Sequence, residues 1–261
     1  MNILIFSDTH GSWDSMYQRA IDNNCDIILH CGDIELLKDE SDIPFYPAPK
    51  RFKEEYLTGA KHFEYARYFN VGSVPIPTYF ISGNHENWRA LYNIIQGPVS
   101  IIKNLYYFGN FGVIKLENGI VIAGLSKIFH ELYSITTTIS KNKEPERWSP
   151  YNKRNNSPKR AAYLHIYDVY TLMRLCRKYE KIDILLLHEN PYSIDAPGKV
   201  IGAEIITELI KKIRPGVVFC GHMHYSSINK IENIPVINIG YDDFIKLDDY
   251  YDISSRSSKI L

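Results

Sequence analysis

The sequence has 261 residues, of which 45% are apolar, so it can bury the core of one large domain or of two small ones. Its 30 Lys and Arg residues balance 30 Asp and Glu residues. This zero net charge excludes any argument for a nucleic-acid partner from overall charge, although it leaves a local basic patch open.

The cysteines and the first residues of the sequence indicate the cellular compartment that we expect. The four cysteines are scattered and form no CxxC pair, so we expect a reducing compartment. The chain begins with a strand-like run rather than a signal peptide, and no apolar run approaches the roughly 20 residues needed to span a bilayer. We therefore expect a soluble intracellular protein with no membrane partner.

Short apolar runs with many β-branched residues recur along the chain and predict strands that are covered on both faces. In chain order these runs lie at 3–6, 26–31, 78–82, 120–125, 182–187, 216–220 and 235–239. Amphipathic stretches at 12–24, 166–180 and 202–213 predict helices. Strands that alternate with helices indicate an α/β fold.

Two segments interrupt this alternation. Residues 35–77 contain prolines at 44, 47 and 49, which predict a loop or an irregular excursion. Residues 129–162 are long and polar, and a loop of that length is usually a binding element or a mobile segment. We expect one domain over 1–247, with 129–162 as an inserted substrate-recognition loop, and a polar tail over 248–261 that frays.

Side chains that can bind metals follow five of the predicted strands. Because ligands bind at the carboxyl ends of strands in open α/β sheets, these side chains are expected to meet. Carboxylate, amide oxygen and imidazole suit Mn²⁺, Fe²⁺ or Zn²⁺. They are too many for one tetrahedral site and suit two divalent metal ions. The candidate metal ligands are Asp8, His10, Asp33, Asn84, His188, His222 and His224.

Each short motif also has an ordinary interpretation. Asp-x-His pairs are common at loop starts, Gly-Asp is a turn signal, and a lone histidine such as His188 is more often structural than a ligand. The Gly221-His222-Met223-His224 stretch is a stronger signal, because alternate residues of an extended segment present both imidazoles on one side. All five motifs in order favour a metal site.

The ordered motifs D-x-H, G-D, G-N-H-E, lone His and G-H-x-H resemble the signature of the calcineurin-like metallophosphoesterase superfamily. Within it, residues 31–56, 63–86 and 101–129 are similar to RNA lariat debranching enzymes. The resemblance implies a two-sheet β-sandwich flanked by helices, with two metals at the strand ends. Asp8 departs from the Cys that debranching enzymes typically carry there, which favours occupancy of both metal positions.

The resemblance also implies a mechanism. One ion is expected on Asp8, His10, Asp33 and His224, and the other on Asp33, Asn84, His188 and His222. A hydroxide between the ions would attack phosphorus. His85, placed beside a ligand, would protonate the leaving oxygen as a catalytic residue. Glu86 would either orient His85 or cap the following helix, and we favour the cap.

By resemblance, the substrate is the 2′–5′ bond of branched (lariat) RNA. Basic residues interleaved with aromatic ones suit phosphates and unstacked bases. The candidate substrate-binding residues of this kind are Lys50, Arg51, Trp148, Tyr151, Lys153, Arg154 and Arg160. A solvated basic loop explains the run over 141–160 equally well.

Two other functions stay open. The enzyme would be a phosphatase or nucleotide phosphodiesterase if its substrate were another phosphoester. A non-catalytic scaffold is disfavoured, because the candidate ligands and His85 are all present.

Overall fold

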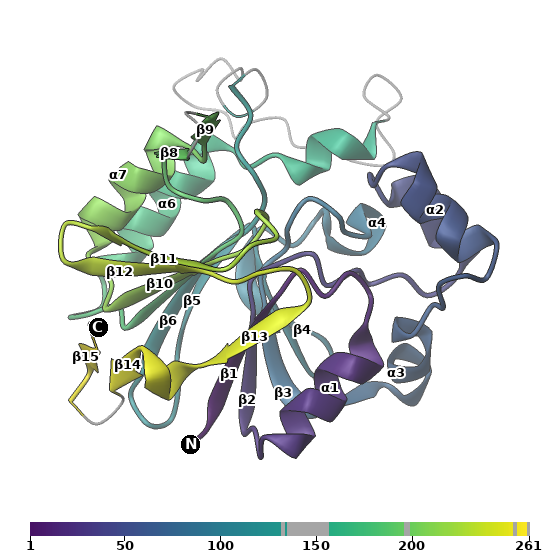
Figure 1. The fold of residues 1–261 in the computed structure, drawn as a ribbon, viewed down its shortest axis with the longest axis horizontal. Helices are drawn as coiled ribbons and strands as arrows, with labels where there is room; N and C mark the ends of the chain where they lie inside the picture. Colours follow the sequence, from purple (N-terminus) through teal and green to yellow (C-terminus); the bar gives the residue numbers. More distant parts are fainter. Residues whose placement is uncertain (132–133, 135–156, 196–198, 253–254, 260–261) are drawn as a thin grey trace.

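The computed structural model describes residues 1–131, 134, 157–195, 199–252 and 255–259 (Figure 1). Trp148, Tyr151, Lys153 and Arg154 lie outside these described residues. The main sheet has 11 strands in the order β11-β12-β10-β7-β6-β5-β4-β3-β2-β1-β13. Its strands are β1 Ile3–Ser7, β2 Ile27–His30, β3 Ser73–Phe80, β4 Gln96–Gly109, β5 Phe111–Lys115, β6 Val121–Leu125, β7 Ile184–Leu187, β10 Val217–Cys220, β11 Ser227–Ile231, β12 Ile234–Asn238 and β13 Asp243–Lys246.

The sheet consists of two mostly parallel halves. Strands β1 to β4 run parallel to one another, and so do β6, β7, β10 and β12. Strand β5 lies between the halves, antiparallel to β6, and the edge strands β11 and β13 are antiparallel to their neighbours. Two small pairs lie outside the sheet, β8 Ser193–Asp195 with β9 Lys199–Ile201 and β14 Tyr251–Asp252 with β15 Ser257–Ser258.

The two halves face each other across one apolar core. Ile5 and Leu29 from the first half share this core with Leu186 and Phe219 from the second, and all four side chains are fully buried. A flat sheet could not bring these side chains together, so the sheet curls over on itself. The α/β prediction is confirmed, and the two layers of the expected sandwich are parts of one hydrogen-bonded sheet.

Helices cover the outer faces of both halves (Figure 1). Helices α1 Trp13–Asp22, α3 Tyr65–Val71 and α4 Trp88–Leu91 pack against β1 to β4. Helices α6 Ile166–Cys176 and α7 Glu204–Ile213 pack against the second half. Helix α2 Lys50–Leu57 and the 3-10 helix η1 Glu40–Phe45 form a smaller unit with its own apolar cluster, and η2 Pro158–Ala162 and η3 Leu247–Asp249 are short connecting turns.

The predicted strands and helices are all present, with ends that differ by a few residues. The expected loop over 35–77 is wrong, because this segment contains η1, α2, α3 and the start of β3. Its tyrosines explain the difference: Tyr46 and Tyr56 bury their rings in the cluster beneath α2, and Tyr65 and Tyr68 bury theirs beneath α3. These aromatic anchors give short helices enough apolar contact to form despite the prolines.

Two residues within the expected tail, Tyr251 and Arg256, make contacts with the rest of the fold. The Tyr251 side chain is fully buried in the core between the sheet halves, and its hydroxyl donates to Asp183 Oδ1 at 2.5 Å. Arg256 donates to both oxygens of the same carboxylate at 2.9 and 2.6 Å. Tyr251 and Arg256 therefore fasten this segment to the start of β7.

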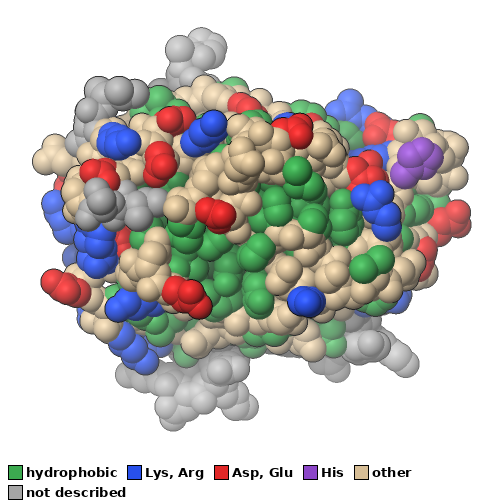
Figure 2. All heavy atoms as spheres, turned by 90° about the horizontal axis from the view of Figure 1, so that it is seen from below, with side chains coloured by type: hydrophobic (Ala, Val, Ile, Leu, Met, Phe, Trp, Pro, Cys, Tyr) green, Lys and Arg blue, Asp and Glu red, His purple; other side chains and the backbone are tan. Residues whose placement is uncertain are grey.

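The two ends of the parallel strands differ in character. Seen from below, where the strands begin, apolar side chains gather at the centre of the face (Figure 2). The polar loops with the candidate metal ligands follow the opposite, carboxyl ends. Within the described residues, no helix is long and apolar enough to cross a membrane.

Candidate metal centre

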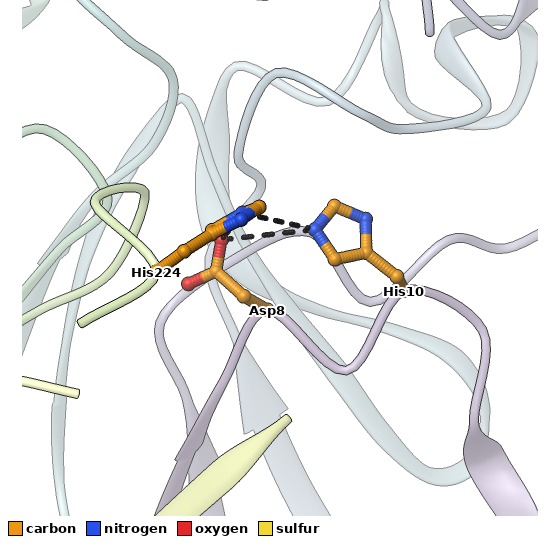
Figure 3. Close-up of side chains that lie close together, drawn as sticks. All are labelled: Asp8, His10 and His224. Atoms are coloured by element: carbon orange, nitrogen blue, oxygen red, sulfur yellow. Dashed lines mark hydrogen bonds and ion pairs between the residues drawn. The ribbon is translucent and has the colours of Figure 1, made fainter. Parts of the chain in front are cut away.

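The polar side chains that follow β1, β2, β3, β7 and β10 meet in one cluster at the carboxyl ends of these strands. In one part of it, His10 Nε2 lies 3.3 Å from His224 Nε2 and 3.9 Å from Asp8 Oδ1 (Figure 3). Asp8 Oδ1 lies 3.3 Å from His224 Nε2. Two imidazole nitrogens and one carboxylate oxygen therefore face a common point, as the ligands of a metal ion do.

A second group lies beside the first. His188 Nε2 lies 3.5 Å from Asp33 Oδ2 and 3.1 Å from Asn84 Oδ1. The ring of His222 lies 5.1 Å from that of His188, centroid to centroid. Asp33 Oδ2 also lies 3.8 Å from His10 Nε2, in the first group. Asp33 thus stands between the groups, where one carboxylate can serve two ions.

The backbone at this cluster is held in an unfavourable conformation. The left-handed φ values are 49° at Asp8, 44° at His10, 58° at Asp33, 71° at His222 and 58° at His224. Each such residue costs of the order of 1–3 kcal/mol when it is not glycine, and residues of this kind gather at functional sites. Five of the seven predicted ligands carry this strain, which eight other described non-glycine residues share, and its concentration at the cluster favours a functional explanation.

Two glycines let the loops approach closely. A Cβ on Gly83 would collide with Asp33 and lie 2.5 Å from His188 Nε2. A Cβ on Gly221 would lie 2.6 Å from Asp8 Oδ2. A side chain at either position would therefore push the candidate ligands apart, as expected for the glycines of these motifs.

The electrostatics at His10 and His188 favour positive charge. Burial alone would lower the pKa of His188 and His10, but the neighbouring Asp33 raises the first to about 10, and Glu35 with Asp33 raises the second to about 9. Burial would raise the pKa of Asp33, yet His188 and His85 hold it well below its usual range. The carboxylates thus attract positive charge, which protons supply in the metal-free protein.

The hydrogen bonding of the Asp8 carboxylate shows whether the site suits a metal ion. Asp8 is fully buried; its Oδ2 accepts from Ser7 Oγ and His222 N, whereas its Oδ1 has no hydrogen-bond partner among the described residues. A buried carboxylate oxygen without a donor is costly. Because this oxygen faces two imidazoles, a divalent cation would satisfy it. The donor set of the first group therefore fits a divalent ion.

His85 lies at the edge of the cluster. Its backbone N donates to Asp33 Oδ1 at 2.7 Å, and its ring lies 5.2 Å from that of His10. Its Nδ1 is buried and has no hydrogen-bond partner among the described residues. The imidazole thus sits next to the candidate ligands with a nitrogen left for another partner.

Glu86 does not cap the helix that follows it. Asn87 is the N-cap of α4, and the Glu86 side chain instead turns back to the loop after β2. There it accepts hydrogen bonds from Ile34 N at 3.1 Å and Glu35 N at 3.0 Å, fully buried. The expectation of a cap is therefore wrong: this carboxylate braces the loop that carries Asp33.

Glu35 was missed in the sequence. Its buried carboxylate lies with Oε1 2.8 Å from His10 Nδ1, and its Oε2 accepts from Tyr56 OH at 2.7 Å and Lys61 Nζ at 3.2 Å. The Tyr46 hydroxyl also donates to it. An acidic residue two positions after Asp33 was the only signal available in the sequence. The donors around Glu35 lie 11 to 26 residues away in the sequence.

The candidate substrate residues are only partly placed. Lys50 is 89% exposed and pairs with Glu54 at 3.3 Å, whereas the Arg51 guanidinium lies 4.6 Å from the ring centre of its neighbour Phe52. That ring lies 6.1 Å from the ring of His85, so α2 borders the cluster. Arg160 is exposed in η2.

The sequence of this chain is similar to those of known proteins. A sequence model of the family described as Calcineurin-like phosphoesterase matches residues 1–226. The chain is 29% identical over 249 residues to a lariat debranching enzyme from Arabidopsis thaliana, covering 86% of this chain and 54% of the relative. It is 27% identical over 252 residues to the lariat debranching enzyme of Homo sapiens, covering 86% and 42%. The chain thus spans about half the length of the curated relatives it matches.

Solved structures agree on the fold. A protein of Thermus thermophilus superposes with a TM-score of 0.56 at 15% identity, covering 98% of this chain and 96% of that one. A dimetal phosphatase from Danio rerio superposes with a TM-score of 0.52 at 11% identity, covering 93% and 88%. At these identities the likeness concerns the fold.

Proposed function

The chain belongs to the calcineurin-like phosphoesterase family, whose members hydrolyse phosphoesters with divalent metals, and on that premise we propose that it is a phosphodiesterase that cleaves the 2′–5′ bond of branched RNA. The observation that carries the phosphoesterase chemistry is the convergence of the candidate ligands at the carboxyl ends of five strands. Support for branched RNA comes from the names of the relatives in Arabidopsis thaliana and Homo sapiens.

The side chains that would hold the ions follow from the two groups. Asp8, His10 and His224 would hold one ion, Asn84, His188 and His222 the other, and Asp33 would contact both. When bound, divalent ions supply Lewis acidity that activates water and offsets the charge of the phosphate. The buried carboxylates set the charge of the site, and His10 Nε2 and His188 Nε2 face its interior.

His85 is the group we assign to the leaving oxygen. Its position beside the cluster would let the imidazole donate a proton to, or hydrogen-bond, an oxygen that departs from phosphorus. The backbone N–H of His85 donates to Asp33, which ties the main chain at His85 to a candidate ligand.

Helix α2 borders the site through Phe52 and carries a cation on either side of that residue. Arg51 and Lys53 flank Phe52, and neither makes an ion pair with another described residue. Cations of this kind suit the phosphates that adjoin a scissile bond in RNA.

The experiment is a cleavage assay with the purified, Mn²⁺-supplemented protein. It compares a branched RNA that carries one 2′–5′ bond, a linear RNA of the same sequence, and bis-p-nitrophenyl phosphate. We expect cleavage of the branch with little action on the linear RNA. Hydrolysis of the chromogenic ester without action on the branch would assign the protein to another phosphoester. A protein that hydrolyses none of the three would contradict the enzymatic proposal itself.

A further inference from the structure

An exposed aromatic ring stands at the metal centre without a role in the chemistry above. The ring of Tyr241 stacks on that of His10, with centroids 5.3 Å apart and planes 23° apart. It also lies 5.2 Å from the ring of His224. Tyr241 is nevertheless 52% exposed. A large ring that covers two candidate ligands and still faces solvent is placed where a substrate must arrive.

The position of Tyr241 follows from a sharp change of environment along the chain. Residues 234–240 are all buried, and Tyr241 is the first exposed residue after them. A tyrosine that only followed a strand could direct its side chain towards any part of the solvent. Here the strand end directs its ring onto the candidate ligands.

The backbone on both sides of Tyr241 is fixed. Before it, Gly240 N donates to Ser226 Oγ at 3.1 Å. After it, Asp242 N donates to Asp8 O at 3.1 Å, and Arg19 Nη1 donates to Asp242 O at 2.7 Å. Arg19 also pairs with the Asp242 carboxylate at 2.5 Å. Because the backbone is held, little freedom is lost when the ring binds a partner, which is what makes tyrosine an effective contact residue.

These observations point to the kind of group that binds. The ring surface is flat and apolar, and it lies beside the rings of His10 and His224, two of the candidate ligands that a bound phosphate would approach. A planar group attached to that phosphate would find this surface. In a phosphodiester of RNA, that group is a nucleobase, and bases bind aromatic rings by stacking irrespective of their identity.

We propose that Tyr241 forms a nucleobase-binding subsite, on which a base adjoining the scissile phosphate stacks. The subsite rests on the proposed function, because it takes the phosphate to be bound at the candidate metal centre. It deepens that function by naming what the site recognises beyond phosphate, namely a nucleoside. Tyr241 is thus a specificity-determining residue for a nucleotide substrate.

The test measures binding rather than turnover. Calorimetric titration of the Mn²⁺-loaded protein with adenosine 5′-monophosphate and with ribose 5-phosphate separates the base from the phosphate. Three variants are compared with the unaltered chain: Tyr241→Ala, Tyr241→Phe, and Tyr170→Ala as a control. Tyr170 is 48% exposed on α6, on the outer face of the other half. The Mn²⁺ content of each variant is determined alongside.

We expect Tyr241→Ala to bind adenosine 5′-monophosphate about tenfold or more weakly, within the range of base–aromatic stacking, and ribose 5-phosphate almost unchanged. Tyr241→Phe should retain the nucleotide affinity, since the ring remains, and Tyr170→Ala should match the unaltered chain. Equal weakening of both ligands, or loss of Mn²⁺, would show that Tyr241 only supports the candidate ligands. No change with the nucleotide, or no preference of the unaltered chain for it over the sugar phosphate, would overturn the subsite.

The outcome is separable from that of the cleavage assay. A Tyr241-dependent preference for the nucleotide in a protein that cleaves no phosphodiester would retain the subsite and reject the proposed function. Cleavage of branched RNA by a protein that binds adenosine 5′-monophosphate and ribose 5-phosphate with equal affinity would retain the proposed function and reject the subsite.

Discussion

Glu35 Oε1 lies 2.8 Å from His10 Nδ1 and fixes the orientation of that imidazole. An ionised carboxylate can only accept a hydrogen bond, and burial, which would raise the pKa of Glu35, is outweighed by His10, which lowers it. Nδ1 is therefore the donor, and Nε2 is directed towards Asp8 and His224. Carboxylate–histidine pairs of this kind orient the ligands of metal sites.

Replacing Glu35 by Gln should weaken metal binding. An amide is neutral and presents an NH₂ group to one of the donors now around it, so His10 loses its fixed orientation. We expect the affinity for one of two Mn²⁺ ions to fall roughly 10- to 100-fold, the usual effect of changing such a partner. Calorimetric titration with Mn²⁺ measures it. Asp39→Asn, which alters an exposed carboxylate, is the control; equal affinities in the two variants would contradict the role given to Glu35.

Metal binding should release protons and strengthen with pH. In the metal-free protein the pKa is about 9 for His10 and about 10 for His188. Both imidazoles are therefore protonated and positively charged at pH 7. Metal ligands must be neutral imidazoles, so loading should release about two protons per chain at pH 7. Titrations in two buffers of different ionisation enthalpy count them. Heats that do not depend on the buffer would contradict the raised pKa values.

The same pKa values bear on the stability of the metal-free fold. Because the pKa of both imidazoles is raised above the ordinary 6.5, their charged forms stabilise the folded state. This contribution is complete below about pH 6.5 and is lost as the pH rises through 9 to 10. The carboxylate of Asp33, whose pKa is lowered, contributes in the opposite sense, at pH values above its ordinary pKa.

His85→Ala should separate turnover from metal binding. The imidazole is assigned to the leaving oxygen and is not among the candidate ligands. Removing a general acid usually costs about 10²- to 10⁴-fold in rate. We expect a loss of this order in kcat, on whichever ester the protein cleaves, with Mn²⁺ content unchanged. His62→Ala removes an exposed histidine for comparison. Full activity in His85→Ala, or loss of its metal, would refute the assignment.

Arg256→Gln should destabilise the fold although it lies near the chain end. Asp183 is fully buried and accepts from Arg256, Tyr251 and Val121, so the substitution leaves a buried carboxylate with fewer donors. The Arg256 side chain is 38% exposed, which tempers the effect to about 1–2 kcal/mol of unfolding free energy. Urea unfolding at a fixed metal concentration measures it.

Arg214→Gln provides the matched comparison. Arg214 pairs with Glu232 at 2.9 Å, but both side chains are well exposed. Such surface pairs contribute about 0–1 kcal/mol. If both substitutions shifted the urea midpoint equally, the Arg256 contact would be no more than a surface ion pair.

The candidate ligands could be predicted from the sequence because each is local to a strand end. An apolar run followed at once by Asp, Asn or His predicts both the strand and the polar side chain at its carboxyl end. The structure brings these predicted side chains together. Their assignment to two ions stays a prediction, as do the roles given to His85 and the basic residues.

The residues that support the cluster were not predictable in the same way. Glu86 binds backbone N–H groups 51 and 52 residues away, at Glu35 and Ile34, and no nearby pattern signals such a contact. Its position just before a helix favoured a cap instead. Tyr251 stands among charged residues in the sequence, yet the curl of the sheet leaves a gap for its ring that no local pattern indicates.

The curled sheet divides the ligands between two separate stretches of chain. His10 and His224, whose Nε2 atoms lie 3.3 Å apart, are 214 residues apart in sequence. Asp8, His10, Asp33 and Asn84 precede residue 134, and His188, His222 and His224 follow residue 157. A chain cut between these positions would give two fragments, each with an incomplete metal site. The shared core and the β6–β7 and β1–β13 pairings would still join the fragments, and divalent ions would add a further link between them, so metal should strengthen the reassembly of a split protein.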